Sequence, residues 1–189
     1  MDVKEAIEKR RAYRSLEPVE VTDGMIKELA TAAQLTASCF NNQPWRFVFV
    51  RSKEQLLKMR EALNKGNAWA FEDSMMIAVF GKKDKDCIIK EREYWLFDIG
   101  MAVSAMLLRA TELGLVAHPI AGYSPEKAGE ILGIPKDNMI ITLINVGKQS
   151  DKVNPVLNEK QAEQERARPQ RRKLTEIYSV DTYSPELEK

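Results

Sequence analysis

The sequence has few of the residues that build disulfide frameworks and metal sites. It contains two cysteines and one histidine among 189 residues. Cys39 and Cys87 lie 48 positions apart (87 − 39) and form no CxxC motif. We therefore expect no disulfide framework, no multi-histidine metal site and no bound metal. This cysteine usage is typical of proteins from a reducing, cytoplasmic compartment.

An excess of either charge is also missing. Lys and Arg number 29 against 28 Asp and Glu, which gives a net charge of +1. A nucleic-acid partner is disfavoured, because such partners usually bind to a strongly basic face. No apolar run approaches the ~20 residues that a membrane-spanning helix needs. The charged start at Asp2, Lys4 and Glu5 does not resemble a signal peptide, so we expect a cytoplasmic protein without a membrane partner.

Hydrophobic periodicity predicts alternating helices and strands. Helices are expected near residues 3–13, 22–35, 52–63, 90–113 and 124–133, and strands near 47–50, 75–80, 116–120 and 139–146. This order indicates a single α/β or α+β domain with a small central sheet, spanning residues 1–150. Between Ile99 and Ala110 only Ser104 and Arg109 are polar. The helix around them is therefore expected to be buried on all sides, in a core or a subunit interface.

Residues 151–189 differ from the rest of the chain. They are polar, contain three prolines (Pro155, Pro169 and Pro185) and include a basic run that ends near Lys173. Such a segment cannot bury much surface on its own. It is either a disordered tail or an arm that orders against another surface.

Several motifs that would identify a catalytic site are missing. The sequence has no Walker A loop, no GxGxxG fingerprint and no GxSxG nucleophile elbow. His118 stands among apolar residues, and the simplest interpretation is a core histidine. Cys39 has no neighbouring base in the sequence, which favours a structural cysteine over a reactive thiol.

Arginines form the most informative pattern. Arg10, Arg11 and Arg14 have helical spacing at the end of the first predicted helix, and Arg171 and Arg172 lie in the C-terminal segment. Cations at a helix C-terminus are also expected from the helix dipole alone. Guanidinium groups nevertheless suit phosphate, because they donate paired hydrogen bonds in a fixed geometry. The loop from Ser38 to Trp45 is rich in hydroxyl and amide groups, which suits either a flat heteroaromatic ligand or a simple capping loop.

Four segments together resemble the nitroreductase family of FMN-dependent oxidoreductases. They are residues 10–14 (RRAYR), 41–47 (NNQPWRF), 112–123 (ELGLVAHPIAGY) and 169–177 (PQRRKLTEI). Their order and spacing agree with the family over nearly the whole chain. The resemblance implies an α+β nitroreductase-like fold with a mainly antiparallel sheet. It also implies a homodimer in which residues 151–189, a C-terminal extension of the same domain, wrap the partner subunit.

The resemblance also implies a set of FMN contacts. Arg10, Arg11 and Arg14 would hold the phosphate and the pyrimidine side of the flavin, with Arg172, assisted by Arg171, completing the phosphate site. Ser38, Cys39 and Asn41 would come from the other subunit, and Asn67 would contact the pyrimidine edge. The backbone of Ala121 and Gly122 would face flavin N5, so no side chain is expected to be catalytic. The FMN-contact residues are therefore Arg10, Arg11, Arg14, Ser38, Cys39, Asn41, Gln43, Asn67, Pro119, Ile120, Ala121, Gly122, Arg171 and Arg172.

This chain departs from the family in two places. Gln170 stands where many members have a basic residue, and Arg171 is expected to substitute for it. Only residues 81–90 are available for the helical lid of many members, which predicts an open cleft and loose substrate selectivity.

The implied activity is NAD(P)H-dependent reduction of nitroaromatic, quinone or flavin-type acceptors by a two-step ping-pong scheme. Two alternatives remain at this point. One is a flavin carrier or sensor of the same fold without physiological reductase activity. The other is a nucleic-acid adaptor that uses the basic C-terminal segment, and the balanced net charge disfavours it.

Overall fold

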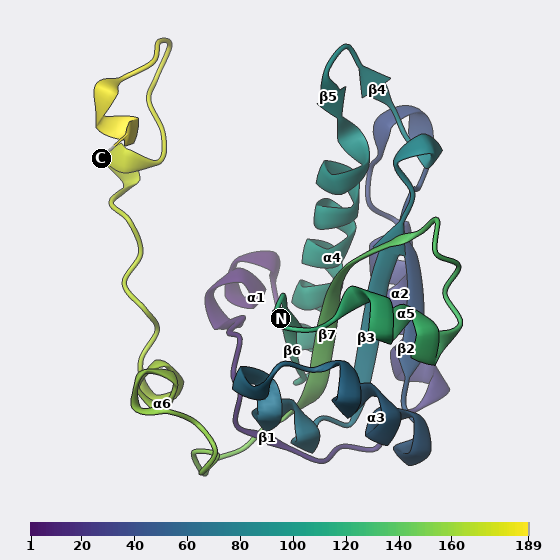
Figure 1. Ribbon diagram of the computed structural model, residues 1–189. Helices are drawn as coiled ribbons and strands as arrows, with labels where there is room; N and C mark the ends of the chain where they lie inside the picture. The colour runs from purple at the N-terminus through teal and green to yellow at the C-terminus, as the bar shows by residue number, and fades with distance from the viewer. Residues whose placement is uncertain (189) are drawn as a thin grey trace.

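A five-stranded antiparallel sheet forms the centre of the molecule (Figure 1). The computed structural model describes residues 1–188. Strand β7 (Met139–Gln149) pairs with β1 (Leu16–Glu17), β3 (Met75–Gly81) and β6 (Val116–Ile120), and β3 also pairs with the edge strand β2 (Arg46–Val50). This topology confirms the expected α+β class with a central antiparallel sheet.

Helices cover both faces of the sheet, and β3 shows how. Its residues Met75, Ile77 and Val79 join the core formed with α2 (Asp23–Gln34) and α4 (Tyr94–Glu112). The alternate residues Met76 and Ala78 join the core formed with α3 (Lys53–Met59) and α5 (Pro125–Leu132). A strand buried on both faces reads as one continuous apolar run, which is why the sequence located it well.

Local capping signals set several helix ends as expected. The side chains of Thr22, Ser52 and Ser124 accept hydrogen bonds from the backbone in the first turns of α2, α3 and α5. Pro125 begins α5, and Gly133 ends it with a φ of 66° in the left-handed region. These ends depend on neighbouring residues alone, so the sequence could place them.

Three helices are shorter than expected, and for α3 the α-helix ends at Met59, followed by a 3-10 turn at Arg60–Ala62. Helix α1 (Val3–Lys9) ends before the arginines, so Arg10, Arg11 and Arg14 lie on an extended segment and not on a helix. Helix α4 begins at Tyr94, because residues 82–93 form a short 3-10 turn and a hairpin of β4 (Ile88–Ile89) and β5 (Arg92–Glu93). Residues 82–93 of the described chain therefore contain no helical lid.

Helix α4 is buried on one face only within a single chain. Trp95, Ile99 and Met106 are buried, whereas Leu96 and Phe97 are 46% and 61% exposed. The expected burial on all sides is therefore not met inside one subunit. No helix within residues 1–188 combines the length and the apolar character needed to cross a membrane.

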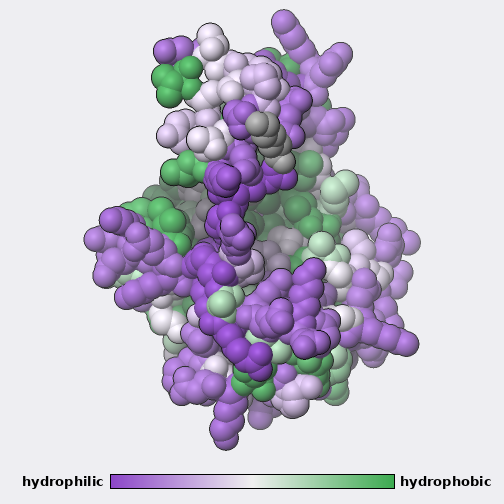
Figure 2. Space-filling view, turned by 90° about the vertical axis from the view of Figure 1, so that its left-hand side faces the viewer, coloured by the Kyte–Doolittle hydropathy of each residue, from purple (hydrophilic) through white to green (hydrophobic). Residues whose placement is uncertain are grey.

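The C-terminal segment extends away from the body after α6 (Glu159–Arg166) (Figure 1). Beyond α6 the described residues form only two short 3-10 turns, Leu174–Glu176 and Pro185–Glu188. Figure 2 shows this segment crossing one face as a hydrophilic band, with hydrophobic surface on either side. Its own apolar side chains are exposed, namely Leu174, Ile177, Tyr178, Val180 and Tyr183.

The expectation that the two cysteines form no disulfide framework is wrong, because they are bonded to each other. Cys39 and Cys87 form a disulfide, with their Cα atoms 6.1 Å apart. Forty-eight positions separate them in sequence, but tertiary folding brings both segments to the N-terminal end of α4. The spacing of the two cysteines in the sequence does not predict that they meet, because the chain between them, which includes α3 and β3, returns Cys87 to the vicinity of Cys39. The cysteine count therefore no longer supports a reducing compartment.

Two buried ionisable groups have pKa values shifted in opposite directions. Burial lowers the pKa of His118 to about 4, although its Nδ1–H donates a hydrogen bond to the Tyr13 carbonyl at 3.0 Å. Burial raises the pKa of Asp73 to about 8, and its Oδ2 atom has no hydrogen-bond partner within the described residues. His118 stacks on Trp69 with ring centroids 4.7 Å apart, in agreement with the interpretation as a core histidine.

We predict a pH-dependent stability difference between the wild-type chain and His118→Gln. Below its unfolded pKa near 6.5, His118 binds a proton more readily in the unfolded chain, so the wild type loses stability as the pH falls to about 4. Asp73 has the opposite dependence in this window but contributes equally to both proteins. Denaturant unfolding from pH 7 to pH 4 should therefore show the wild type losing about 3 kcal/mol relative to the variant. A constant difference would contradict a buried neutral His118.

Candidate functional site

A pocket lined mostly by arginines lies where the two ends of the chain meet. Its lining consists of Arg10, Arg11, Ala12, Arg14, Gln164, Arg168, Pro169 and Arg171. The lining includes no carboxylate. Five guanidinium groups around one pocket without an acidic partner form a strong site for an anion, above all for a phosphate that can accept several charge-assisted hydrogen bonds.

Glu165 joins the two ends of the chain at this pocket. Its carboxylate accepts hydrogen bonds from the backbone N–H groups of Arg14 and Ser15, both at 2.9 Å. The glutamate is 9% exposed, so both bonds are shielded from water. Because a charged acceptor satisfies two backbone donors at once, these bonds hold residues 14–15 beside α6.

Three of the arginines already have hydrogen-bond partners at the pocket, and Arg14 Nη1 donates to Gln164 Oε1 at 3.1 Å. The Nη2 of Arg11 donates to the carbonyl of Gln164 at 2.6 Å, at the C-terminal end of α6, and its guanidinium lies 4.4 Å from the Tyr13 ring centroid. Arg168 donates to the carbonyls of Glu8 and Arg10 at the end of α1. Each helix end therefore receives a guanidinium from the opposite end of the chain, as the helix dipole favours.

Arg10 and Arg171 are the free cations of this pocket. Within residues 1–188 neither guanidinium donates a hydrogen bond or forms an ion pair with another residue. Burial lowers the pKa of Arg10, and the nearby charges of Arg168 and Arg171 lower it further. The cluster therefore repels itself in the absence of a ligand, and an anion bound between Arg10 and Arg171 would relieve that repulsion.

A second group of expected residues lies on the same side of the sheet. The amide of Asn67 donates to the carbonyl of Gly122 at 2.8 Å, and its oxygen accepts from Trp69 at 3.2 Å. A Cβ at position 122 would lie 2.6 Å from the Asn67 amide nitrogen, so the contact needs a glycine there. The hydrogen bond from His118 to Tyr13 links this group to the arginine segment.

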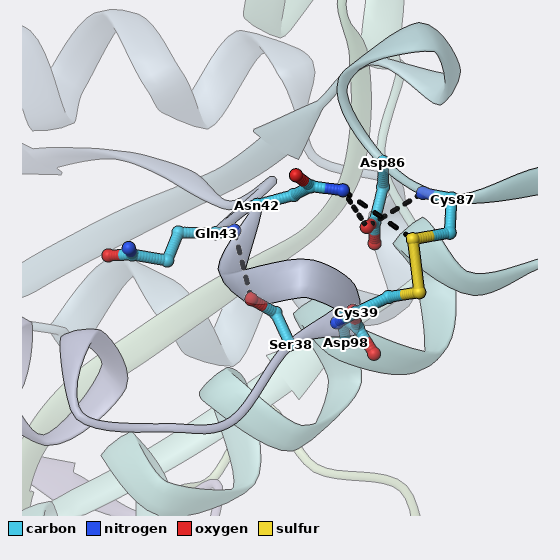
Figure 3. The surroundings of a disulfide bond; sticks show 7 residues. All are labelled: Ser38, Cys39, Asn42, Gln43, Asp86, Cys87 and Asp98. Carbon is cyan, nitrogen blue, oxygen red and sulfur yellow. Dashed lines mark hydrogen bonds between the residues drawn. A yellow bond between two sulfur atoms is a disulfide. The ribbon is translucent and has the colours of Figure 1, made fainter.

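The loop with the remaining expected residues lies elsewhere in the chain. Ser38 Oγ accepts from the Gln43 backbone at 3.0 Å, and Cys39 donates to buried Asp98 at 2.7 Å (Figure 3). Burial raises the pKa of Asp98; the Cys39 N–H lowers it, and neighbouring Asp86 raises it again. Three non-glycine residues of the loop, Phe40, Asn41 and Gln43, have positive φ values of 47°, 57° and 48°. Such strain persists only where surrounding contacts hold it, and it is concentrated at binding sites.

The loop and the N-terminus of the chain contact opposite ends of α4. Asp98 near the start of α4 accepts a hydrogen bond from Cys39, whereas Glu112 at its end lies 3.9 Å from the amino group of Met1, two residues before α1 begins. Asp98 and Glu112 are 14 positions apart, which is about 21 Å along the helix at 1.5 Å per residue. The arginine pocket is lined by Arg10, Arg11, Arg14 and Arg171 and by none of Ser38, Cys39, Asn41 and Gln43, and Asn67 contacts Gly122 separately.

Three residues of the arginine site were missed by the sequence analysis. Gln164 and Arg168 line the pocket, and Glu165 holds it together. They belong to the polar helix α6 and the segment after it, where no sequence pattern distinguishes a charged residue that lines a site from one on the solvated surface. Arg172 lies outside the pocket lining, so its phosphate contact stays a prediction.

The fold and the paired arginine segments define a class of α+β proteins with an anion site formed by both chain termini. The nitroreductase family's sequence profile matches residues 7–75 and 64–148, and the chain belongs to that family. This membership confirms the resemblance drawn from the four sequence segments, and with it the oxidoreductase class.

Individual relatives agree with the family assignment. An NADH dehydrogenase from Thermus thermophilus is 27% identical over 186 residues, covering 82% of this chain and 90% of that protein. A solved oxidoreductase containing FMN is 26% identical with a TM-score of 0.81, covering 97% of this chain and 94% of that one. A nitroreductase family protein from Clostridium difficile has a TM-score of 0.77 at 24% identity, covering 97% of this chain and 100% of that one, and supports the fold.

We predict that Glu165→Gln loosens the arginine site. The amide would leave one of the two backbone N–H donors of residues 14 and 15 facing another donor, at a cost of about 1–3 kcal/mol in unfolding free energy. Limited proteolysis should then cut near α6 faster than in the wild type. Glu163→Gln, on the exposed side of the same helix, is the matched control and should behave as the wild type. Equal cleavage rates for both variants would contradict the proposed clamp.

Proposed function

We propose that this protein is an FMN-dependent NAD(P)H oxidoreductase. The observation that carries the proposal is the acid-free arginine pocket beside the Asn67–Gly122 contact, in a chain of the nitroreductase family. FMN would supply two-electron redox chemistry, accepting a hydride from NAD(P)H and passing the electrons to an acceptor. The protein supplies binding, orientation and electrostatics for this cofactor.

The residues present fit the phosphate of FMN. A phosphate dianion offers oxygen acceptors to the free guanidiniums of Arg10 and Arg171, and Arg14 adjoins them in the same pocket. Arg11 and Arg168 hold the helix ends around it. We propose that Arg171 takes the place of the basic residue that Gln170 does not provide, with Arg172 as a further phosphate contact.

The flavin ring would lie between two subunits. We propose contacts from Asn67, Pro119, Ile120, Ala121 and Gly122 of one subunit and from Ser38, Cys39, Asn41 and Gln43 of the other. The arginine pocket supports this division, because none of Ser38, Cys39, Asn41 and Gln43 lines it and their loop bonds to the end of α4 opposite the N-terminus. The arginines would also stabilise negative charge that develops on the pyrimidine side during reduction. No side-chain acid or base is required in this scheme.

We propose a homodimer in which the exposed face of α4 lies at the interface and residues 151–189 wrap the partner. Leu96 and Phe97 on α4 and the apolar side chains of the arm support the proposal, because each is exposed in one chain. Exposed apolar patches of this kind mark interaction surfaces. Residues 1–150 would form the FMN-binding domain, and residues 151–189 would be a C-terminal extension of that same domain.

We propose nitroaromatics, quinones and flavins as acceptors, reduced in a ping-pong sequence after NAD(P)+ has left. The short 82–93 segment supports an open cleft and loose selectivity, since it forms a hairpin in place of a helical lid. Use of NAD(P)H also supports a cytoplasmic location. The second candidate function is a flavin carrier or sensor of the same fold, without physiological reductase activity.

Rapid-mixing absorbance separates a reductase from a carrier. We expect purified protein to be yellow, and NADH or NADPH should bleach the bound flavin within seconds under anaerobic conditions. A later addition of a quinone should reoxidise the flavin and restore the colour. In separate steady-state assays, double-reciprocal plots of initial rates at several quinone concentrations should give parallel lines. A flavin that stays oxidised with both nucleotides would contradict the reductase and favour the carrier.

A matched pair of substitutions tests the arm at the proposed interface. Ile177 in the arm and Leu57 on α3 are both 59% exposed in the single chain. We expect Ile177→Asp to raise the dimer dissociation constant at least about tenfold, since a charge would be buried against the partner. Leu57→Asp should leave the dimer intact. Light scattering after size exclusion measures both, and dimers of equal stability would contradict the wrapping arm.

A further inference from the structure

The disulfide lies within a cluster of potential metal ligands. The sulfur atoms of Cys39 and Cys87 and a carboxylate oxygen of Asp86 lie within 4.8 Å of one another. These ligands come from two segments, the loop 38–43 and the turn before β4, which makes the cluster a link between them (Figure 3). Neither the family membership nor the proposed flavin chemistry uses Asp86 or Cys87.

The surroundings of the cluster point toward a cation. The Oδ2 atom of Asp86 is buried and has no hydrogen-bond partner among the described residues. The nearby lysines are engaged elsewhere, since Lys82 pairs with Asp137 and Lys83 with Glu93. The carboxylate of Asp98 is the acidic neighbour of Asp86, and each carboxylate disfavours a negative charge on the other. A cation at Asp86 Oδ2 would relieve this repulsion and pair a buried oxygen that is costly to leave without a partner.

Asn42 already supplies the outer contacts that a thiolate site needs. Its Nδ2 donates to Asp86 Oδ1 at 3.2 Å and to Cys87 Sγ at 3.5 Å. The backbone N–H of Cys87 donates to the same Asp86 oxygen at 2.8 Å. Hydrogen bonds of this kind orient ligands and stabilise their negative charge, leaving Asp86 Oδ2 free to bind.

We propose that the reduced form of this cluster binds a thiophilic divalent cation of the Zn²⁺ type through Cys39, Cys87 and Asp86. Two thiols RSH reduce the disulfide, which yields RSSR and two cysteine thiols. The cation then displaces both thiol protons to solvent and forms two metal–sulfur bonds and one bond to Asp86, with water in the fourth position. Ligand atoms of a tetrahedral zinc site lie about 3.3–3.8 Å apart, so the sulfurs separate while remaining within the present cluster.

The two thiolate ligands determine the metal selectivity of the proposed site. Two sulfurs and one carboxylate favour Zn²⁺ over Mg²⁺ or Ca²⁺, which prefer sites built entirely of oxygen. The bound metal would link the loop 38–43 to residues 82–93 in the reduced protein, as the disulfide does in the oxidised one. Both links would hold the strained residues Phe40, Asn41 and Gln43 in place.

Cobalt binding tests the site without reference to flavin or activity. Full-length protein is reduced with dithiothreitol, freed of it by gel filtration without oxygen, and titrated with Co²⁺. We expect one Co²⁺ per chain, a thiolate-to-cobalt charge-transfer band, and displacement by one equivalent of Zn²⁺. The oxidised protein should show no such band. A reduced wild type without the band, or an oxidised protein with the same band, would overturn the proposal.

Two variants and a control separate a designed cluster from incidental thiol binding. Cys87→Ser should lose most of the charge-transfer intensity, and Asp86→Asn should weaken Zn²⁺ binding at least about tenfold. Asp84→Asn, an exposed carboxylate two positions away, should bind as the wild type. Circular dichroism shows that each variant is folded. Wild-type affinity in Asp86→Asn would overturn the assignment of its carboxylate as a ligand.

Discussion

Arginines from both ends of the chain repel one another in a single pocket, and the contacts that hold them there join the two chain ends. Arg10, Arg14 and Arg171 share a pocket without a carboxylate in its lining. Contacts between side chains and the backbone hold them together. The Glu165 carboxylate accepts from two backbone N–H groups, and two guanidiniums donate to the carbonyls at the ends of α1 and α6. Burial and the charges of Arg168 and Arg171 lower the pKa of Arg10, and a bound anion would relieve this repulsion. A phosphate suits this role, because it accepts several charge-assisted hydrogen bonds from guanidinium groups. The neutral overall charge hides this local excess.

The second constraint is the length of α4. The loop at the disulfide bonds to the start of α4 and the N-terminus of the chain contacts its end, about 21 Å apart along the helix. None of the loop residues expected around the flavin lines the arginine pocket of the same chain. The same helix exposes Leu96 and Phe97, and the arm exposes its own apolar side chains. An incomplete site and unburied apolar surface have a common explanation in a second copy of the chain. The proposed dimer would therefore complete the site and bury the surface together.

Sequence patterns predicted those parts of the fold that depend on neighbouring residues. The buried strand β3 and the caps of α5 at Ser124 and Gly133 are examples. They failed where tertiary contacts override local preference. Helix α1 stops at Lys9, and residues 14–15 of the following segment bond to Glu165, about 150 positions away. The disulfide and the roles of Gln164 and Arg168 have the same origin, since no local signal marks which distant charges will meet.

The phosphate site is tested by comparing FMN with riboflavin, because the two ligands share the flavin ring and differ in the phosphate. Fluorescence titration of the apoprotein gives both affinities, and Arg10→Gln is compared with Arg51→Gln, an exposed arginine paired with Asp23 outside the pocket. The arginine account predicts that FMN binds at least about a hundredfold more tightly than riboflavin, and that Arg10→Gln removes much of this preference while Arg51→Gln does not. Equal affinity of the wild-type protein for FMN and riboflavin would contradict a phosphate site formed by the two chain ends.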